Sequence, residues 1–182
     1  MSRIIPEFRY ADETEVSAAQ LMTPEWANFS GNVHGGSVLR LVDDIAYVCA
    51  MRYAGAVCVT AAVDRVDFHE PIHVGNLLRL SACVCHVGRT SMEVEINIFA
   101  EDIPSGNSRH TNTCYLTMVA LEEGTPVPVP RLVCRTREDK ARCIQAKMRR
   151  ALGLRYRAER ARFQEQYRAM DDAALDAEIA RP

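Results

Sequence analysis

The stretch Asn28-Phe-Ser-Gly-Asn-Val-His-Gly-Gly-Ser-Val-Leu-Arg-Leu-Val-Asp-Asp-Ile-Ala-Tyr47 joins a polar loop to the start of an apolar helix. A Gly-Gly pair lets the backbone approach a ligand closely, and a helix that begins there directs unpaired N–H groups at it. Such N–H groups suit a carbonyl oxygen or an anion. Asp43, two turns further along the helix, could then act on what is held at the helix start.

Hydrophobic periodicity predicts one long helix among several strands. Apolar residues at helical spacing indicate a helix from Gly35 to about Tyr53, which Gly55 ends. After an irregular lead-in over residues 1–14, strand-like segments occupy residues 15–22, 56–68, 76–87, 91–102 and 110–121. Short turns between the later strands imply mostly antiparallel pairing, so the predicted class is α+β, with the helix packed against a curved sheet.

The end of the chain differs from the rest in composition. The alternating prolines of residues 125–130 predict an extended strap that closes a domain of residues 1–130. Residues 131–182 form a predicted Arg-rich amphipathic helical extension, one helix or a pair, with a break at Gly153. The 182-residue length favours one domain with this extension as an appendage.

Charge is divided unevenly between these two parts. Residues 1–130 carry 8 basic and 16 acidic residues, whereas residues 131–182 carry 14 basic and 8 acidic ones, which gives −8 against +6. A basic tail suggests an arm that binds phosphate or nucleic acid. The favoured interpretation is a helix that packs on the acidic body or on a neighbouring subunit, because interspersed acids dilute the basic field. No nucleic-acid partner is therefore expected.

Composition also predicts the compartment. A hydrophobic content of 48% and a charged content of 25% are typical of a soluble globular protein. The seven cysteines contain no CxxC pair, which favours reduced core residues over a zinc site or a disulfide framework. The first 15 residues have no apolar core of signal-peptide length, and Arg52 interrupts the longest apolar region. We therefore expect a cytoplasmic protein without membrane insertion.

Several motifs occur in a distinctive order. They are Asn28, Gly31-Asn-Val-His-Gly-Gly36, Asp43, Val63-Asp-Arg-Val-Asp-Phe68 with Pro71, and Val87-Gly-Arg-Thr-Ser91. As a set they resemble the acyl-CoA thioester hydrolases of the brain acyl-CoA hydrolase and YciA type, over about residues 10–130. The resemblance implies a hotdog fold, in which a five-stranded antiparallel sheet wraps around one central helix.

The resemblance also implies a catalytic site shared between two subunits. Similar enzymes use an acid on the central helix of one subunit and an Asn from the loop ahead of that helix in the partner. Asp43, expected to be partly buried, matches the acid and would be the general base for water or, less favoured, the nucleophile. Asn28, with Asn32 as a second candidate, would orient the water or the thioester.

The helix start would bind the oxyanion. The donor would be the backbone N–H of Gly35 or Gly36, and His34 would either hold the loop or carbonyl or merely cap the helix. His69 and the other histidines lack ligand spacing, so no metal is expected.

Contacts to coenzyme A would come from Asn32 and from one short turn, whose residues are Gly88, Arg89, Thr90 and Ser91. Within this turn, Arg89 would bind a phosphate of CoA or be an ordinary exposed turn residue. CoA is part of the substrate and the product, so no cofactor is expected.

Two functions of different class follow. The first is hydrolysis of medium- to long-chain acyl-CoA, since a hotdog dimer offers an apolar tunnel, with assembly as a dimer or as a trimer of dimers (a hexamer). The alternative is a non-catalytic acyl-CoA sensor; a hotdog dehydratase would arrange its Asp and His differently. Asp43 together with Asn28 favours hydrolysis, because binding alone needs neither residue.

Overall fold

The computed structural model describes residues 6–68 and 70–181, so what was predicted for residues 1–5 and for His69 lies outside these ranges. The chain divides into two compact units, residues 1–143 and 144–182. The domain boundary after residue 130 stays a prediction. None of the described helices is long and apolar enough to cross a membrane.

Helix α1 (Gly35–Ala54) is the centre of the first unit, and the predicted helix is confirmed to within one residue. Its C-cap Gly55 has a φ of 61°, a left-handed conformation that glycine adopts without steric cost, and its N–H donates to the Met51 carbonyl (2.6 Å). The buried face of α1 comprises Val38, Val42, Ile45, Ala46, Cys49, Ala50, Tyr53 and Ala54. Val48, one of the apolar residues whose helical spacing predicts α1, is exposed instead.

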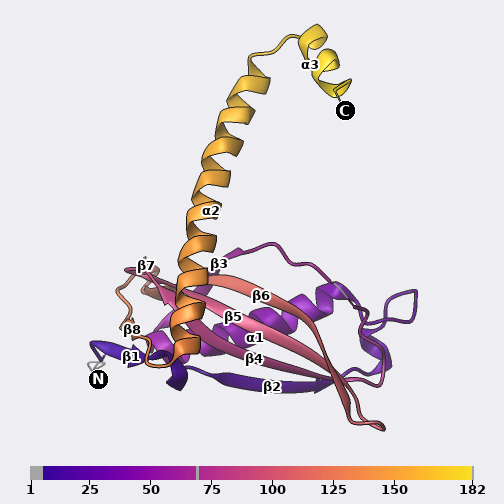
Figure 1. The fold of residues 1–182 in the computed structure, drawn as a ribbon, viewed down its shortest axis with the longest axis vertical. Coiled ribbons are helices and arrows are strands. Elements are labelled where there is room, and N and C mark those ends of the chain that lie inside the picture. The colour runs from indigo at the N-terminus through magenta and orange to yellow at the C-terminus, as the bar shows by residue number, and fades with distance from the viewer. Residues whose placement is uncertain (1–5, 69, 182) are drawn as a thin grey trace. The chain divides into compact units, whose positions relative to one another are not determined.

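The main sheet confirms the predicted hotdog arrangement. Its principal strands are β2 (Val16–Leu21), β3 (Val57–Val63), β4 (Leu77–Val87), β5 (Ser91–Asp102) and β6 (Asn107–Glu122). They lie in the order β2-β4-β5-β6-β3, each pair antiparallel. Figure 1 shows this sheet curving around α1. The inward side chains of the strands and the buried face of α1 form one apolar core.

Two strand lengths differ from the prediction. Strand β6 extends further at both ends than residues 110–121, and β3 ends at Val63 rather than at residue 68. Asp64 donates its N–H to the Tyr115 carbonyl (2.9 Å), but its carboxylate then accepts from the N–H of Arg65 (2.8 Å). This local bond gives the backbone an alternative to the ladder, so β3 ends and a loop follows.

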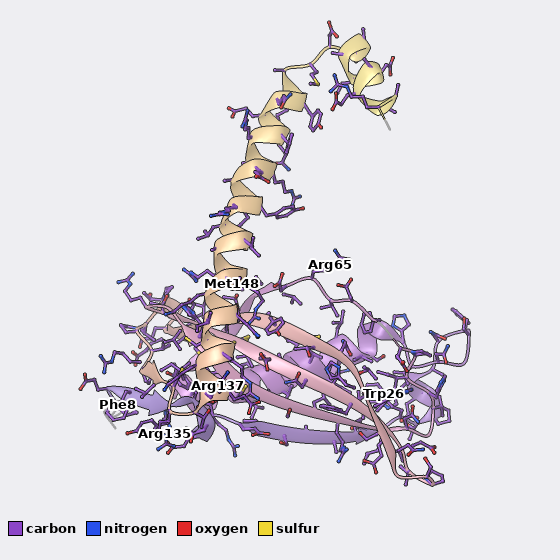
Figure 2. The ribbon with its side chains drawn as sticks, viewed as in Figure 1. Phe8, Trp26, Arg65, Arg135, Arg137 and Met148 are labelled. Carbon is purple, nitrogen blue, oxygen red and sulfur yellow. The ribbon has the colours of Figure 1, made fainter. Side chains whose placement is uncertain are left out.

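The lead-in is more ordered than predicted. Strand β1 (Phe8–Tyr10) pairs in parallel with β8 (Arg131–Val133), and a 3-10 helix, η1 (Ala11–Glu13), follows β1; η2 (Pro24–Trp26) is a second 3-10 turn. Arg135, labelled in Figure 2, binds this segment through Asp12 (2.7 Å). Its guanidinium lies 3.8 Å from the centre of the Tyr10 ring. The prediction of an irregular lead-in is therefore wrong for residues 8–10, whose partners lie more than 120 residues away in the chain.

The proline-rich strap forms as predicted, with a short strand β7 (Thr125–Pro126) paired to β6. Val127 donates its N–H to Ala120 (2.9 Å) and Val129 donates to Arg89 (3.0 Å). The buried Tyr53 hydroxyl donates to the Pro130 carbonyl (2.8 Å). Because proline has no N–H, donors remain only on the intervening residues, and these hold the strap on the body.

The C-terminal residues form α2 (Arg137–Arg168) and α3 (Asp172–Ile179). Thr136 and Asp139 make a reciprocal capping box at the start of α2, with N–H to side-chain distances of 3.0 and 3.1 Å. The predicted break at Gly153 is wrong, since α2 continues through it. A glycine inside a helix costs about 1 kcal/mol, which the surrounding Ala, Leu and Arg residues offset.

Candidate active site

His34 is the N-cap of α1. Its Nδ1 accepts a hydrogen bond from the Gly36 N–H (3.0 Å), and its carbonyl accepts from Ser37 (2.9 Å). A Cβ at position 36 would lie 3.1 Å from that Nδ1, so glycine is the residue that fits beside the ring. Of the two roles considered for His34, this geometry shows the cap, and it occupies the N–H of Gly36.

Gly35 provides the open donor at the helix start. No acceptor for its N–H lies among residues 6–68 and 70–181. A Cβ at this position would lie 3.5 Å from the Phe68 ring, which is ordinary contact, so Phe68 covers one side of the glycine without filling it. An N–H at the positive end of a 20-residue helix suits an oxygen that develops negative charge.

The loop before the helix is held by Asn28. Its Oδ1 accepts from the N–H groups of Ser30 (2.8 Å) and Asn32 (3.2 Å), which closes the loop around Gly31, whose φ is 79°. Asn32 is fixed in turn, since its Oδ1 lies 2.9 Å from the Nδ1 of His73. In the described part of the chain, the Asn28 amide nitrogen has no acceptor. Asn28 can therefore donate to a ligand while its oxygen keeps the loop rigid.

Asp43 lies on the other side of α1 from the core. The expected partial burial is wrong for the single chain: Val42 and Ile45 take the core face, and Asp43 falls outside it and is exposed. Thr60 of β3 donates its hydroxyl to the Asp43 Oδ1 (2.5 Å). This bond fixes one carboxylate oxygen, and the other has no hydrogen-bond partner among the described residues.

Sequence reasoning missed Thr60. It lies at an irregularity of β3, where the register with β6 shifts between Thr60 and Ala62, and such bulges often redirect a side chain. The pairing depends on where β3 crosses α1, which only the folded chain defines. A lone threonine within a strand pattern carries no signal of its own.

The turn predicted to contact CoA joins β4 to β5 and is held by its own backbone. Gly88 donates its N–H to the Ser91 carbonyl (2.7 Å), and the Thr90 carbonyl accepts from the N–H of Ala120 (3.0 Å). Thr90 is half-buried and Arg89 is exposed. Arg89 is therefore the side chain of this turn with the freest reach to a ligand, and a contact between Thr90 and CoA stays a prediction.

A single chain does not bring the predicted site residues together. Gly35 and Asp43 are eight residues apart on α1, about 12 Å at ~1.5 Å per residue. The turn of residues 88–91 lies by the far end of that helix, because the Arg89 carbonyl accepts from Val129 and the neighbouring Pro130 carbonyl from Tyr53. Tyr53 is about 27 Å from Gly35 by the same rise. The helix start, the acid and the predicted CoA turn are thus three separate places on one subunit.

Three of the seven cysteines are unsuited to act as nucleophiles. All seven are free thiols. Burial raises the pKa of Cys49 to about 12 and the pKa values of Cys83 and Cys114 to about 11. These three thiols stay protonated at neutral pH, and Cys49 and Cys114 are core residues. Within the described ranges, no three His, Cys, Asp or Glu side chains are placed to hold a metal ion.

A surface hollow of about 560 Å³ lies over β2, β4 and β5. Arg79, Phe99, Ser17 and Ser81 are among the residues that line it. None of the predicted catalytic residues does so. This hollow therefore does not enclose the predicted catalytic residues.

The curved sheet, its central helix and the acid that β3 holds on that helix define a protein of the hotdog class. The profile of the Thioesterase superfamily matches residues 30–106. Protein VdlD of Helicobacter pylori is 48% identical over 121 residues, 66% of this chain and 70% of that protein. The uncharacterized acyl-CoA thioester hydrolase YkhA of Bacillus subtilis is 37% identical over 74% of this chain and 78% of its own. The chain belongs to the hotdog-fold acyl-CoA thioesterase family.

Solved structures agree with this assignment. A hexameric acyl-CoA thioesterase superposes with a TM-score of 0.79 at 35% identity, covering 86% of this chain and 98% of its own. Acyl-CoA hydrolase from Staphylococcus aureus, solved with butyryl coenzyme A and coenzyme A, has a TM-score of 0.78 at 30% identity over 90% of this chain and 99% of its own. The same enzyme has been solved as its Asn28→Ala, Asp43→Ala and Thr60→Ala mutants.

Proposed function

We propose that this protein hydrolyses acyl-CoA thioesters to free acid and coenzyme A. The observation that carries the proposal is the Thr60–Asp43 hydrogen bond, which holds an exposed carboxylate on the central helix of a thioesterase-family fold. This chain has Asn, Asp and Thr at positions 28, 43 and 60, the residue types and numbers mutated in the Staphylococcus aureus enzyme. We propose that Asn28, Asp43 and Thr60 act in hydrolysis in this chain.

The site is completed by two subunits. Because Gly35 and Asp43 of one chain are about 12 Å apart along α1, both cannot contact one carbonyl carbon. Asp43 of one copy therefore acts with Asn28 and the Gly35 N–H of the partner subunit. The proposed oxyanion donor is therefore the Gly35 N–H of the partner subunit, and not an N–H of the helix that carries the Asp43 of the same site. Gly36 is not proposed as the donor, since its N–H already donates to His34.

An apolar band supports self-association next to Asp43. The exposed side chains of this band come from the sheet edge β3 and from α1, and each is 40–56% exposed: Tyr47, Val48, Val57, Val59 and Val63. Strand β3 is the last in the sheet order, so no strand of the described residues pairs with its outer edge. A second copy that covers this band would desolvate Asp43 and enclose the thioester, as a dimer or within a trimer of dimers.

The reaction follows from these positions. The free oxygen of Asp43 takes a proton from water as the water oxygen attacks the thioester carbonyl carbon. Negative charge develops on the carbonyl oxygen and is stabilised by the Gly35 N–H and the helix N-terminus, while Asn28 donates its amide N–H to the thioester or the water. The tetrahedral intermediate collapses with loss of the CoA thiolate, which takes up the proton. A thiolate leaves readily, so no strong leaving-group acid is needed.

The finer features of the function are also proposals. Medium to long acyl chains would run between the two copies in an apolar tunnel. Asn32 and the turn of Gly88, Arg89, Thr90 and Ser91 would contact CoA at opposite ends of α1, and so from different subunits. No cofactor is required, no nucleic acid takes part, and the protein acts in the cytoplasm.

Thiol release from acyl-CoAs of increasing chain length tests hydrolysis. We expect Asp43→Asn to lower kcat by about 10²–10⁴-fold, as loss of a general base does, with the unfolding midpoint unchanged. Thr60→Val should lower kcat about 10-fold, because it removes one hydrogen bond to a charged group. Asp44→Asn, the matched control on the neighbouring residue, should leave kcat unchanged. Acyl-CoA binding without thiol release in the unmodified chain would instead favour the sensor.

Subunit mixing tests the shared site. Asp43→Asn and Asn28→Ala copies, unfolded together and refolded, should recover about a quarter of unmodified activity, because half the dimers are mixed and each has one intact site of two. Either variant alone should stay inactive. A mixture that recovers no activity would place both residues in one subunit's site and would contradict the two-subunit assignment.

A further inference from the structure

The C-terminal unit exposes a long apolar stripe. Over residues 144–168 of α2, about 38 Å of helix, six large apolar side chains fall within an arc of roughly 140° at about 100° per residue. Each is 41–65% exposed: Ile144, Met148, Leu152, Tyr156, Phe163 and Tyr167. Met148 is labelled in Figure 2. A stripe of this length on a soluble helix marks a surface that another molecule covers.

The charge of the residues around the stripe indicates which kind of surface covers it. Residues 144–168 contain 8 basic and 2 acidic side chains, a net charge of +6. Two such helices would repel one another, so a pair of α2 helices is disfavoured. The body of the chain, residues 1–130, has a net charge of −8. The helix and the body are thus complementary in charge.

A bilayer fits this helix less well than a protein does. Glu159 lies near the middle of the apolar arc, between Tyr156 and Phe163, where a membrane would have to bury an unpaired carboxylate. The residues that follow α2 are acidic: residues 171–181 contain four acids, including Asp171 and Asp172, and a single Arg181. An acidic element beside the helix would be repelled by anionic lipid. A protein surface can pair Glu159 with its own cations.

The apolar stripe and the positive charge of the helix together indicate one partner. We infer that residues 144–168 of α2 dock on the acidic body of a second copy of this chain. The inference rests on the self-association in the proposed function and adds a contact separate from the β3 band. One helix covers on the order of 400 Å² when its ~38 Å length is taken with a ~10 Å width. Reciprocal docking doubles this and reaches the roughly 800 Å² per partner of a stable interface.

The test is the mass of the full chain in solution, measured by light scattering after size exclusion over a dilution series. We expect the double variant Met148→Glu/Leu152→Glu to raise the dissociation constant of the higher assembly at least 100-fold and to leave dimers joined at the β3 band. Leu154→Glu is the matched control, because it makes the same change on the opposite side of α2, and it should keep the unmodified mass. High salt should weaken the unmodified assembly, since opposite charges hold it.

The outcomes separate this inference from the proposed function. A double variant with unmodified mass and dissociation constant overturns helix docking and leaves the β3 dimer standing. A fully monomeric unmodified chain contradicts the self-association in the proposed function itself, and docking fails with it. Sedimentation of the unmodified chain with phosphatidylserine vesicles, abolished by the double variant, would assign the stripe to a membrane and overturn the inference.

Discussion

The hotdog body and the C-terminal helices differ in what stabilises them. In the body, inward side chains of β5 such as Val94, Ile96 and Ile98 are fully buried, and the strands on both sides complete their hydrogen bonds. In residues 144–168 the large apolar side chains are exposed, so the helix depends on its residue propensities and on the capping box at its start. Burial therefore stabilises the body, whereas the exposed apolar side chains of the helix add stability only when another surface covers them.

Core truncation should give the largest effect and separates the two regions most directly. Ile96→Ala in the body should lower the free energy of unfolding by about 2–5 kcal/mol, because it removes buried methylenes and leaves a cavity. Leu154→Ala on the helix, where the side chain is 53% exposed, should change it by less than about 0.5 kcal/mol. Urea unfolding followed by circular dichroism measures both. Equal losses of unfolding free energy in the two variants would contradict this difference between the body and the helix.

Alkaline pH should destabilise the body next most strongly. Burial raises the pKa of Cys49 from 9.0 to about 12, so between these values the unfolded chain has already lost the proton that the folded chain keeps. The free energy of unfolding then falls as pH rises, by up to about 1.4 kcal/mol per pH unit for this group. Unfolding midpoints from pH 8 upward measure the slope.

Two cysteine variants show which group produces that slope. Cys49→Ala should make it shallower. The same change at the partly exposed Cys143 should leave it unaltered. If the Cys49→Ala slope matches that of the unmodified chain, the thiol is not responsible.

A pair of glycine substitutions should give the smallest effects, of opposite sign. Gly153→Ala meets no atom within 4 Å and should stabilise α2 by about 0.5–1 kcal/mol. Gly36→Ala places its Cβ 3.1 Å from the Nδ1 of His34 and should cost about 1 kcal/mol by disturbing the cap, with a loss of thioesterase activity. Thermal unfolding and thiol release measure the pair. Stabilisation by both would show that His34 tolerates a side chain beside it.

Local patterns accounted for most of the fold prediction. The bounds of α1 follow from apolar periodicity and capping, and so does the presence of five strands. The proline strap follows from missing donors. All these effects act between near neighbours in the chain. The pairing of β1 with β8 escaped prediction because each strand has three residues and the two lie far apart in sequence. Gly153 does not break α2, because its helix-forming neighbours outweigh one unfavourable residue.

The site was predicted less completely than the fold. His34, Gly35 and Asp43 could be singled out because small, polar and acidic residues interrupt an apolar pattern, whereas Asn28 is indicated by the family resemblance. The hydrogen bonds that these residues make could not be predicted. The bond from His34 to Gly36 and the bond from Thr60 to Asp43 depend on side-chain directions and on the crossing of β3 and α1.

The sequence by itself determined the elements, the family resemblance, the acid at the centre of the main helix and the opposite charges of body and tail. These are properties of residue type and of spacing along the chain, and they can be recognised within a few turns of helix or a few residues of strand. Only the tertiary structure decided that Thr60 holds Asp43 and that Gly35 keeps an open N–H. The separation of about 12 Å between helix start and acid follows from eight residues of helix, and the tertiary structure leaves each of the two groups without the other, so neither can complete the site alone.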